Sequence, residues 1–237
     1  IGEYIQQSNP YFNLFKSCEL GQDDFAELNE VSKSNNVIFL STPFDFRSVE
    51  LLDELSVPAY KIASCDLTNY PLLKRVAGKN KPIILSTGMG TSTEICTAIE
   101  TIHSEDNDKI ILLHCVSQYP PDLKDINLRT IAWMEKVFQC PVGYSDHSQG
   151  ITISIAAVSL GACVVEKHFT LDKKMEGQDH WLSVDPQELK LMVDSIRDIE
   201  MALGEDRRIV VESKDDIQMI RRSLCTYKPV KAGEIFS

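Results

Sequence analysis

The chain has 237 residues and a formal net charge of −11, with 43% hydrophobic and 25% charged residues. These values are ordinary for a soluble globular protein, and the length suffices for one large domain or for one domain with a small appendage. The acidic charge excludes broad binding to nucleic acids or anionic membranes, because both require clustered basic groups. An anionic small substrate would therefore need a local cationic pocket.

The cysteines and the terminus indicate a reduced, cytoplasmic protein. There are seven cysteines, an odd number, without a Cys-x-x-Cys pair, so we expect free and mostly buried thiols. The first 20 residues lack a basic region followed by an apolar block. The longest stretch of low polarity, Ile151–Val165, is shorter than the roughly 20 residues of a membrane-spanning helix. We therefore expect neither a signal segment nor a membrane span.

Short apolar runs rich in β-branched residues alternate with longer amphipathic segments. Such runs are typical of strands buried on both faces of a parallel sheet. After one helix at about Asp23–Ser32, the sequence predicts six strands at Val37–Ser41, Ala59–Ala63, Pro82–Ser86, Lys109–Cys115, Pro141–Tyr144 and Cys163–Lys167. Helical spacing of apolar residues predicts further helices at Ser48–Leu55, Tyr70–Ala77, Thr91–Ile102, Leu128–Phe138, Ile151–Leu160 and Pro186–Leu203.

Two of these helices carry terminal signals. Thr91 and Glu94 have the spacing of a capping box at a helix start. Pro186 suits a first helical turn, and Gly204 suits the stop that follows the last helix.

The predicted strands end near residues 42, 64, 86, 116, 145 and 168, at intervals of 22 to 30 residues. This rhythm is typical of the βα units of a TIM barrel. A doubly wound sheet is the alternative, but no glycine-rich nucleotide-binding motif follows any predicted strand. Since a closed barrel has eight strands, the fold class that we expect is an α/β TIM (β/α)8-type barrel that lacks its first two strands.

The composition changes after Gly204. Residues 1–204 form the predicted barrel domain, and the highly charged residues 205–220 read as a linker. Residues 221–237 contain Arg-Arg-Ser-Leu and Lys-Pro-Val-Lys-Ala-Gly-Glu, which look like the beginning of a second small unit.

Polar residues cluster at the carboxyl ends of the predicted strands, where TIM barrels carry their functional groups. In chain order they are Thr42; Lys61, Ser64 and Asp66; Ser86; His114, Ser117 and Tyr119; Ser145 and His147; Glu166, Lys167 and His168; and, in a polar loop, Asp179 and His180.

The histidines suggest a metal site. His147 and His168 follow adjacent predicted strands, so a barrel would bring them close together. Two imidazoles with open positions suit Mn²⁺, Zn²⁺ or Fe²⁺, and the alternative is a pair of hydrogen-bonded structural histidines. Asp179 and His180 are candidates for further ligands or substrate contacts, whereas His114 is expected to be a hydrogen-bonded residue of the barrel.

Lys61 is unusual because a lysine inside an apolar strand needs a partner or a ligand. It could bind a phosphate or carboxylate, form a Schiff base, or point outward from an edge strand. Glu166 and Lys167 could form an internal ion pair. Asp66 could act as a general acid or base, or it could cap the helix that follows.

Eight sequence blocks, in order between about residues 20 and 204, resemble the sialic acid synthase family, which makes N-acetylneuraminate and relatives such as legionaminate and pseudaminate. The blocks are Phe-Leu-Ser-Thr-Pro-Phe-Asp at 39–45, Tyr-Lys-Ile-Ala-Ser at 60–64, Thr-Asn-Tyr-Pro-Leu-Leu at 68–73, Lys-Pro-Ile-Ile-Leu-Ser-Thr-Gly-Met at 81–89, Leu-Leu-His-Cys at 112–115, Val-Gly-Tyr-Ser-Asp-His at 142–147, Glu-Lys-His-Phe-Thr-Leu-Asp at 166–172 and Gly-Gln-Asp-His at 177–180.

The resemblance implies a TIM barrel followed by a small antifreeze-like (SAF) domain, of which residues 221–237 would be the beginning, and a homodimer. It implies that phosphoenolpyruvate condenses with an N-acylated amino sugar, such as N-acetylmannosamine, to give a nonulosonic acid and phosphate. It also implies a divalent metal, with Mn²⁺ expected first and Mg²⁺ or Co²⁺ as alternatives.

The same resemblance implies a role for each matching residue. His147 and His168 would hold the metal. Lys61 and Asp66 would be the catalytic residues, and the position of Asp66 is often Glu in the family. The expected substrate-binding residues are Thr42, Ser64, Ser86, Ser117 and Ser145 for phosphoenolpyruvate, and Tyr119 and Asp179 for the amino sugar.

Two other functions are open. One is a Schiff-base aldolase that uses Lys61 or Lys167. The other is an inactive barrel fragment that serves as a binding or dimerisation platform, since the first two family strands, with their sugar contacts, an acidic residue and a lysine, have no counterpart in this chain.

Overall fold

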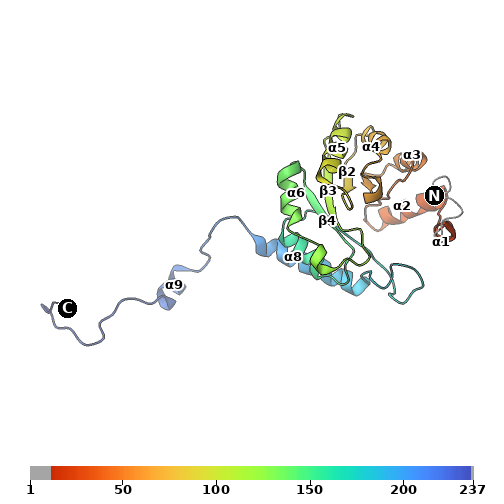
Figure 1. The fold of residues 1–237 in the computed structure, drawn as a ribbon. Helices are drawn as coiled ribbons and strands as arrows, with labels where there is room; N and C mark the ends of the chain where they lie inside the picture. Colours follow the sequence, from red (N-terminus) through yellow and green to blue (C-terminus); the bar gives the residue numbers. More distant parts are fainter. Residues whose placement is uncertain (1–11, 236–237) are drawn as a thin grey trace. The chain divides into compact units, whose positions relative to one another are not determined.

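The protein is described from a computed structural model that covers residues 12–235 (Figure 1). Predictions for residues 1–11 and 236–237 lie outside the described residues. The chain divides into two compact units, Ile1–Leu203 and Gly204–Ser237, which we call unit 1 and unit 2 and describe separately.

Unit 1 alternates helices with short strands. Its elements in chain order are α1 (Phe12–Ser17), α2 (Gln22–Ser34), α3 (Phe46–Glu54), β1 (Tyr60–Ile62), α4 (Tyr70–Ala77), β2 (Ile83–Ser86), α5 (Ser92–His103), β3 (Ile110–Cys115), α6 (Thr130–Phe138), β4 (Val142–Asp146), α7 (Thr152–Ser159), β5 (Val165–Lys167) and α8 (Pro186–Leu203), with 3₁₀ turns at Ser64–Asp66 and Leu123–Asp125. The seven predicted helices are confirmed, and their ends differ from the predicted ones by at most two residues. Helix α1 was not predicted.

The five strands form one parallel sheet in the order β1-β2-β3-β4-β5. A flat sheet of this size would hold its outer strands about 19 Å apart at the usual spacing of about 4.8 Å. However, Lys61 of β1 and Glu166 of β5 bring their charged groups within 3.4 Å of each other. The sheet is therefore strongly curled into a half-barrel, as the α/β barrel prediction requires, although with five strands rather than six.

The core fills the space between the outer face of this sheet and the helices. Ile62, Leu85, Leu112 and Tyr144 point from successive strands into a cluster of buried residues supplied by α3, α4, α5, α6 and α7. Figure 1 shows α3 to α6 along this outer side. Because side chains alternate along a strand, the residues between them, such as Lys61 and Glu166, line the inner face.

The first predicted strand is wrong. Residues Val37–Ser41 form neither a strand nor a helix, and Val37 and Ile38 are 61% and 70% exposed. An apolar run becomes a strand only when a neighbour pairs with its backbone, and β1 pairs only with β2 in the described sheet. The segment is fixed instead by packing, since Phe39 makes an edge-on contact with Phe25 of α2.

The helix termini follow the predicted signals. The hydroxyl of Thr91 accepts a hydrogen bond from the backbone N–H of Glu94, and the carboxylate of Glu94 accepts one from the backbone N–H of Thr91, which completes the capping box of α5. Gly204 follows α8 with a φ of 59°, a left-handed conformation that glycine adopts without steric cost.

The cysteines are free, as predicted, but most of them are exposed. Only Cys115 and Cys140 are buried, whereas Cys18, Cys65, Cys96, Cys163 and Cys225 are exposed. The prediction of buried thiols was wrong because all five exposed cysteines lie outside the strands: Cys96 lies on helix α5, Cys65 in a 3₁₀ turn, and Cys18, Cys163 and Cys225 in loops.

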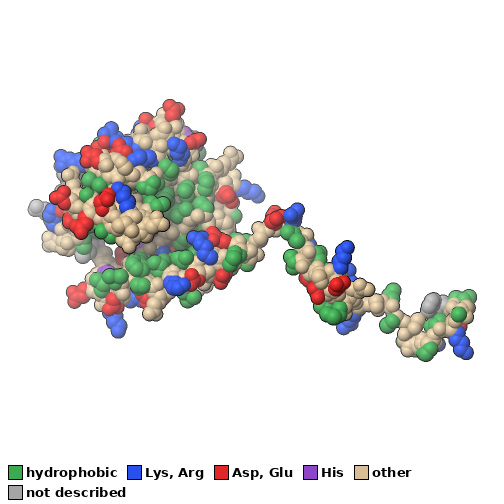
Figure 2. Space-filling model, turned by 180° about the vertical axis from the view of Figure 1, so that it is seen from behind, with side chains coloured by type: hydrophobic (Ala, Val, Ile, Leu, Met, Phe, Trp, Pro, Cys, Tyr) green, Lys and Arg blue, Asp and Glu red, His purple; other side chains and the backbone are tan. Residues whose placement is uncertain are grey.

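The surface of unit 1 mixes charges of both signs. On the face that Figure 2 shows, basic and acidic side chains are interspersed around apolar patches. No helix within residues 12–235 has the length and apolar composition that crossing a lipid bilayer demands.

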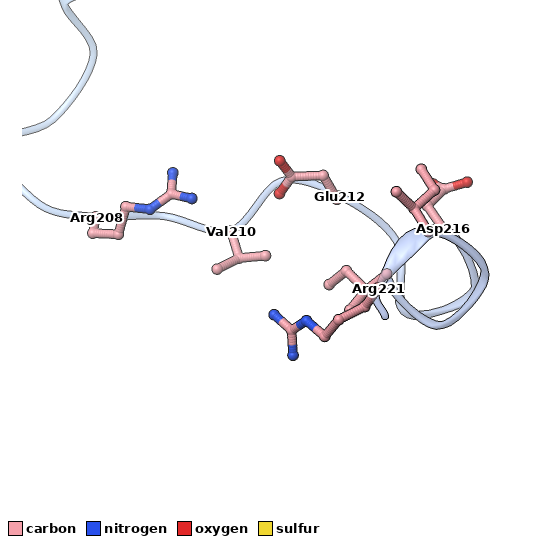
Figure 3. Close-up of a pocket in the computed structure, with 7 residues that line it drawn as sticks. Arg208, Val210, Glu212, Asp216 and Arg221 are labelled. Carbon is pink, nitrogen blue, oxygen red and sulfur yellow. The ribbon is translucent and has the colours of Figure 1, made fainter. Parts of the chain in front are cut away.

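Unit 2 contains helix α9 (Lys214–Ile220), which lies within the segment predicted as a linker. Its side chains are almost all exposed over residues 204–235. A shallow pocket beside α9 is lined by two basic residues, Arg208 and Arg221, two acidic residues, Glu212 and Asp216, and apolar side chains (Figure 3). None of the predicted site residues lies in this pocket.

Candidate active site

The inner face of the half-barrel carries a polar cluster that joins its two outer strands. Lys61 of β1 lies 3.4 Å from Glu166 of β5, and the second carboxylate oxygen of Glu166 accepts a 2.7 Å hydrogen bond from Ser145 of β4. The side chain of Lys61 is only 13% exposed, so it does not point outward from an edge strand. Thr42 lines the same hollow as Lys61 and Glu166.

Glu166 belongs to this cluster, although we did not predict it as a site residue. We considered it only as a partner of Lys167. Consecutive residues of a strand point to opposite faces, so Glu166 meets Lys61 inside the barrel while Lys167 meets Asp146 on the outer side. The signal was available in the sequence, because an acidic residue near the carboxyl end of a barrel strand lies where such barrels carry their functional groups.

His147 and His168 lie side by side at the ends of β4 and β5. Their ring centroids are 5.4 Å apart. The Nδ1 atom of His147 lies 2.9 Å from the carbonyl oxygen of Val116, and a carbonyl can only accept, so Nδ1 carries the proton. This leaves Nε2 as an acceptor, 3.5 Å from the hydroxyl of Ser145. Burial lowers the pKa of His147 and favours the neutral imidazole that a metal ion needs.

This pair fits a divalent cation with open positions. Hydrogen bonding of Nδ1 to a carbonyl is the usual way in which proteins orient a metal-binding histidine. Asp179 approaches the other ring, with its carboxylate 3.8 Å from Nδ1 of His168. Within residues 12–235 no group of three or more His, Cys, Asp or Glu side chains is arranged to hold a metal ion.

The predicted hydroxyl groups gather beside the histidines at the ends of β1, β2 and β3. The hydroxyl of Ser64 accepts a 3.0 Å hydrogen bond from the backbone N–H of Gly88. A Cβ atom at Gly88 would lie 2.4 Å from the Ser117 hydroxyl and 2.8 Å from that of Ser64, so any larger residue there would displace these hydroxyls. The hydroxyl of Ser86 is buried and has no hydrogen-bond partner among residues 12–235. Such a group is costly unless a ligand or water satisfies it.

Tyr119 covers the histidine pair. Its ring stacks on His147 with centroids 4.1 Å apart and meets His168 edge-on at 5.6 Å. Burial raises the pKa of Tyr119 to about 12, so its hydroxyl stays protonated near neutral pH. The tyrosine therefore contributes a neutral, hydrogen-bonding wall beside the imidazoles.

Asp66 makes its hydrogen bonds locally. Its carboxylate accepts a 2.9 Å hydrogen bond from the side chain of Asn69, and Asn69 rather than Asp66 caps α4. The predicted alternative, that Asp66 caps this helix itself, is therefore wrong in detail. Asp66 is half-buried and lies with Ser64 in the 3₁₀ turn that follows β1.

Two further histidines, His114 and His180, are hydrogen-bonded within unit 1. His114 donates from Nε2 to the carbonyl of Ile126 at 2.7 Å, which confirms the prediction of a hydrogen-bonded barrel residue. His180 is bound through Nδ1 to the hydroxyl of Thr170 at 2.7 Å, which occupies one of its two ring nitrogens.

Comparison with known proteins gives a consistent result. Residues 2–208 match the NeuB family. An uncharacterised protein of Methanocaldococcus jannaschii is 47% identical over 236 residues, which cover 99% of this chain and 70% of the relative. The N,N'-diacetyllegionaminic acid synthase of Campylobacter jejuni is 45% identical over 227 residues, which cover 94% of this chain and 68% of that enzyme.

A solved structure has the same fold. The crystal structure of the N-acetylneuraminic acid synthetase of Leptospira borgpetersenii, in complex with citrate, superposes with a TM-score of 0.80 at 39% sequence identity. The match covers 87% of this chain and 71% of the crystallised one.

Proposed function

This chain belongs to the NeuB family, and on that basis we propose that it condenses phosphoenolpyruvate with an N-acylated amino sugar to give a nonulosonic acid and inorganic phosphate. The observation that supports this most directly is the cluster of Lys61, Glu166 and Ser145 beside His147 on the inner face of the curled sheet. It combines a cation and hydroxyl groups, which an anionic substrate needs, with an imidazole pair.

We assign His147 and His168 to a divalent metal, with Mn²⁺ expected first and Mg²⁺ or Co²⁺ as alternatives. The closeness of the two rings and the unprotonated Nε2 atom of His147 suit such an ion. When bound, the ion would supply Lewis-acid polarisation of the sugar aldehyde.

The cationic group and the hydroxyls would hold phosphoenolpyruvate. Lys61 is a cationic residue that lines the hollow, and its ammonium group would pair with the phosphate or carboxylate of phosphoenolpyruvate. Thr42, Ser64, Ser86, Ser117 and Ser145 would complete the anion site. The hydroxyl of Ser86 supports this because it finds no partner in the described part of the chain. Tyr119 and Asp179 would face the amino sugar.

The reaction forms one carbon–carbon bond. The methylene carbon of phosphoenolpyruvate bonds to the aldehyde carbon of the open-chain sugar, and the aldehyde oxygen takes up a proton to become a hydroxyl group. Water adds to the cation left at C2 and loses one proton, which leaves a hydroxyl group there. The bond between C2 and the phosphate oxygen then breaks, the hydroxyl group loses its proton to the departing phosphate, and the keto group forms. We propose Asp66 as the residue that exchanges these protons, and Lys61 as the residue that stabilises the departing phosphate.

Of the two lysines considered for a Schiff-base aldolase, the structure makes Lys167 unsuitable. The Nζ atom of Lys167 is buried in an ion pair with Asp146 on the outer side of the sheet, away from the hollow. Lys61 remains, and borohydride trapping with a keto substrate tests it: a covalent lysine adduct would favour the aldolase.

Phosphate release tests the proposed reaction. The chain is incubated with phosphoenolpyruvate, N-acetylmannosamine and Mn²⁺, with and without EDTA, and then with other N-acylated amino sugars. Release that needs both the sugar and the metal is expected, and the His147→Ala variant is the matched control. No release with any sugar would contradict a competent active site in this chain and would favour a binding or dimerisation platform.

We further propose that residues 221–237 begin an antifreeze-like (SAF) domain and that the protein acts as a homodimer in the cytoplasm. The Arg-Arg-Ser-Leu block after α9 supports the first point by its resemblance to the family. Light scattering at several protein concentrations tests the dimer.

A further inference from the structure

A buried ion pair lies directly behind the two histidines. Asp146 ends β4 and Lys167 ends β5, and the two residues are partners in the register of the sheet. The Nζ atom of Lys167 lies 3.0 Å from the Asp146 carboxylate, and their side chains are 3% and 0% exposed. Each of them immediately precedes one of the histidines.

The hydrogen bonds of this pair extend to the next loop and helix. One carboxylate oxygen of Asp146 accepts from the backbone N–H and the hydroxyl of Ser148, at 2.8 and 2.7 Å. The other accepts from the hydroxyl of Ser154 in α7 at 2.6 Å, in addition to Lys167. Lys167 also donates to the carbonyl of Ser148. The network thus ties together β4, β5, the loop after His147 and α7.

Stability alone does not account for such a pair. Taking two charges out of water costs several kcal/mol each, and apolar residues of similar volume often serve as well or better. A saturated buried network is instead suited to fixing one geometry, because each member accepts or donates in only one arrangement. The geometry fixed in this case is that of the last residues of β4 and β5, from which the two imidazoles project toward the opposite face.

We propose that Asp146 and Lys167 are positioning residues that hold His147 and His168 at the separation required to bind one divalent cation together. This inference rests on the metal site assigned in the proposed function. Residues that orient metal ligands from outside typically change metal affinity by about 10- to 100-fold when they are replaced. The pair does not face the hollow of Lys61 and Glu166, so its effect should fall on metal affinity rather than on binding of phosphoenolpyruvate.

The test measures Mn²⁺ affinity of the full chain by electron paramagnetic resonance of the free ion, without substrates. Asp146→Asn and Lys167→Met are expected to weaken binding by about 10- to 100-fold while circular dichroism shows a folded protein. Lys167→Arg keeps the charge and should retain most of the affinity.

A matched control separates positioning from general stability. Asn107 is likewise buried and donates to the carbonyls of Ala77 and Lys81, but it precedes β3 and so lies at the opposite ends of the strands. Asn107→Ala should lower the unfolding temperature without changing Mn²⁺ affinity. If it weakens Mn²⁺ binding as much as Asp146→Asn does, the positioning role is overturned.

The remaining outcomes are equally decisive. Parental Mn²⁺ affinity in folded Asp146→Asn and Lys167→Met would overturn the inference. If these variants do not fold, Ser154→Ala decides, because it removes one hydrogen bond to Asp146 and keeps the ion pair: several-fold weaker binding supports the inference and unchanged binding overturns it. Binding by His147→Ala equal to that of the parent would instead overturn the metal site itself.

Discussion

Lys61 lies at the centre of the candidate site. Within residues 12–235 its ammonium group forms one ion pair, with Glu166. Its ammonium group lies 3.4 Å from Glu166, donates to the carbonyl of Ile62 at 3.0 Å and lines the hollow with Thr42. A hydrogen bond to a charged group contributes about 1.5–3 kcal/mol, which corresponds to roughly 10- to 100-fold in affinity. We therefore expect Lys61→Ala to raise the KM for phosphoenolpyruvate by at least about tenfold, as measured by phosphate release.

Lys109 provides the control for this prediction. It is a lysine at the amino end of β3 whose Nζ atom donates to Asn80, far along the strand from the hollow. Lys109→Ala should leave the KM for phosphoenolpyruvate unchanged. An unchanged KM in Lys61→Ala as well would assign the anion site to other residues.

His114 makes folding depend on pH. Burial lowers its pKa below the ordinary value of 6.5, so the folded protein keeps this imidazole neutral where the unfolded chain would protonate it. The unfolded state then binds more protons, and stability falls as pH decreases below about 6.5, by at most about 1.4 kcal/mol per pH unit. His114→Gln, whose amide can still donate to Ile126, should show a shallower loss of unfolding free energy between pH 7 and pH 5 in urea titrations.

The exposed His103, at the end of α5, gives the comparison. His103→Gln replaces an exposed histidine and is the control for the loss of an imidazole at the surface. The same slope in His114→Gln and the parent would show that His114 does not contribute.

The placement of the candidate residues at strand ends was predictable from the sequence, but the face of the sheet to which each side chain points was predicted less well. The strand-end positions of Lys61, His147 and His168 follow from the apolar runs that precede them. The partners of Glu166 and Lys167 did not follow, because they depend on which face each residue takes and on the curl that brings β1 near β5. Both are properties of the assembled sheet rather than of any one segment.

At the scale of elements, helix α5 depends on a reciprocal cap. The Thr91 hydroxyl and the Glu94 carboxylate each accept a backbone hydrogen bond from the other residue, which satisfies two N–H groups at the helix start. Loss of such a cap costs about 1 kcal/mol. Thr91→Ala should lower the free energy of unfolding by this amount in urea titrations. Thr93→Ala, an exposed change in the same turn that leaves the cap in place, should have a much smaller effect, and equal effects would argue against the cap.

The segment Val37–Ser41 shows where prediction of elements fails. Its apolar, β-branched residues have the composition of a strand, and local composition is all that a sequence pattern reports. The pattern does not reveal whether a neighbouring backbone is present to pair with it. The helices were predicted closely because their hydrogen bonds lie within the segment itself.

At the scale of the whole molecule, the folding free energy comes from unit 1. The hydrophobic core draws its members from residues between Val49 and Ala162, while side chains after Leu203 are almost entirely exposed over the described residues. Burial of apolar surface is the main driving force of folding and scales with the area removed from water. A chain that ends at Leu203 should therefore unfold within about 2 °C of the full chain, since about 1 kcal/mol would shift the midpoint by roughly 2–4 °C.

A chain that ends at Cys163 is the contrasting variant. It would lack β5, which pairs with β4, and α8, which packs against α7. It would also lose the partners of Asp146 and Ser145, because Lys167 and Glu166 lie in β5. We expect this variant to unfold at a much lower temperature by circular dichroism or not to fold. If ending the chain at Leu203 had a comparable effect, unit 2 would have to contribute to the stability of the half-barrel, and the core assigned to unit 1 would be incomplete.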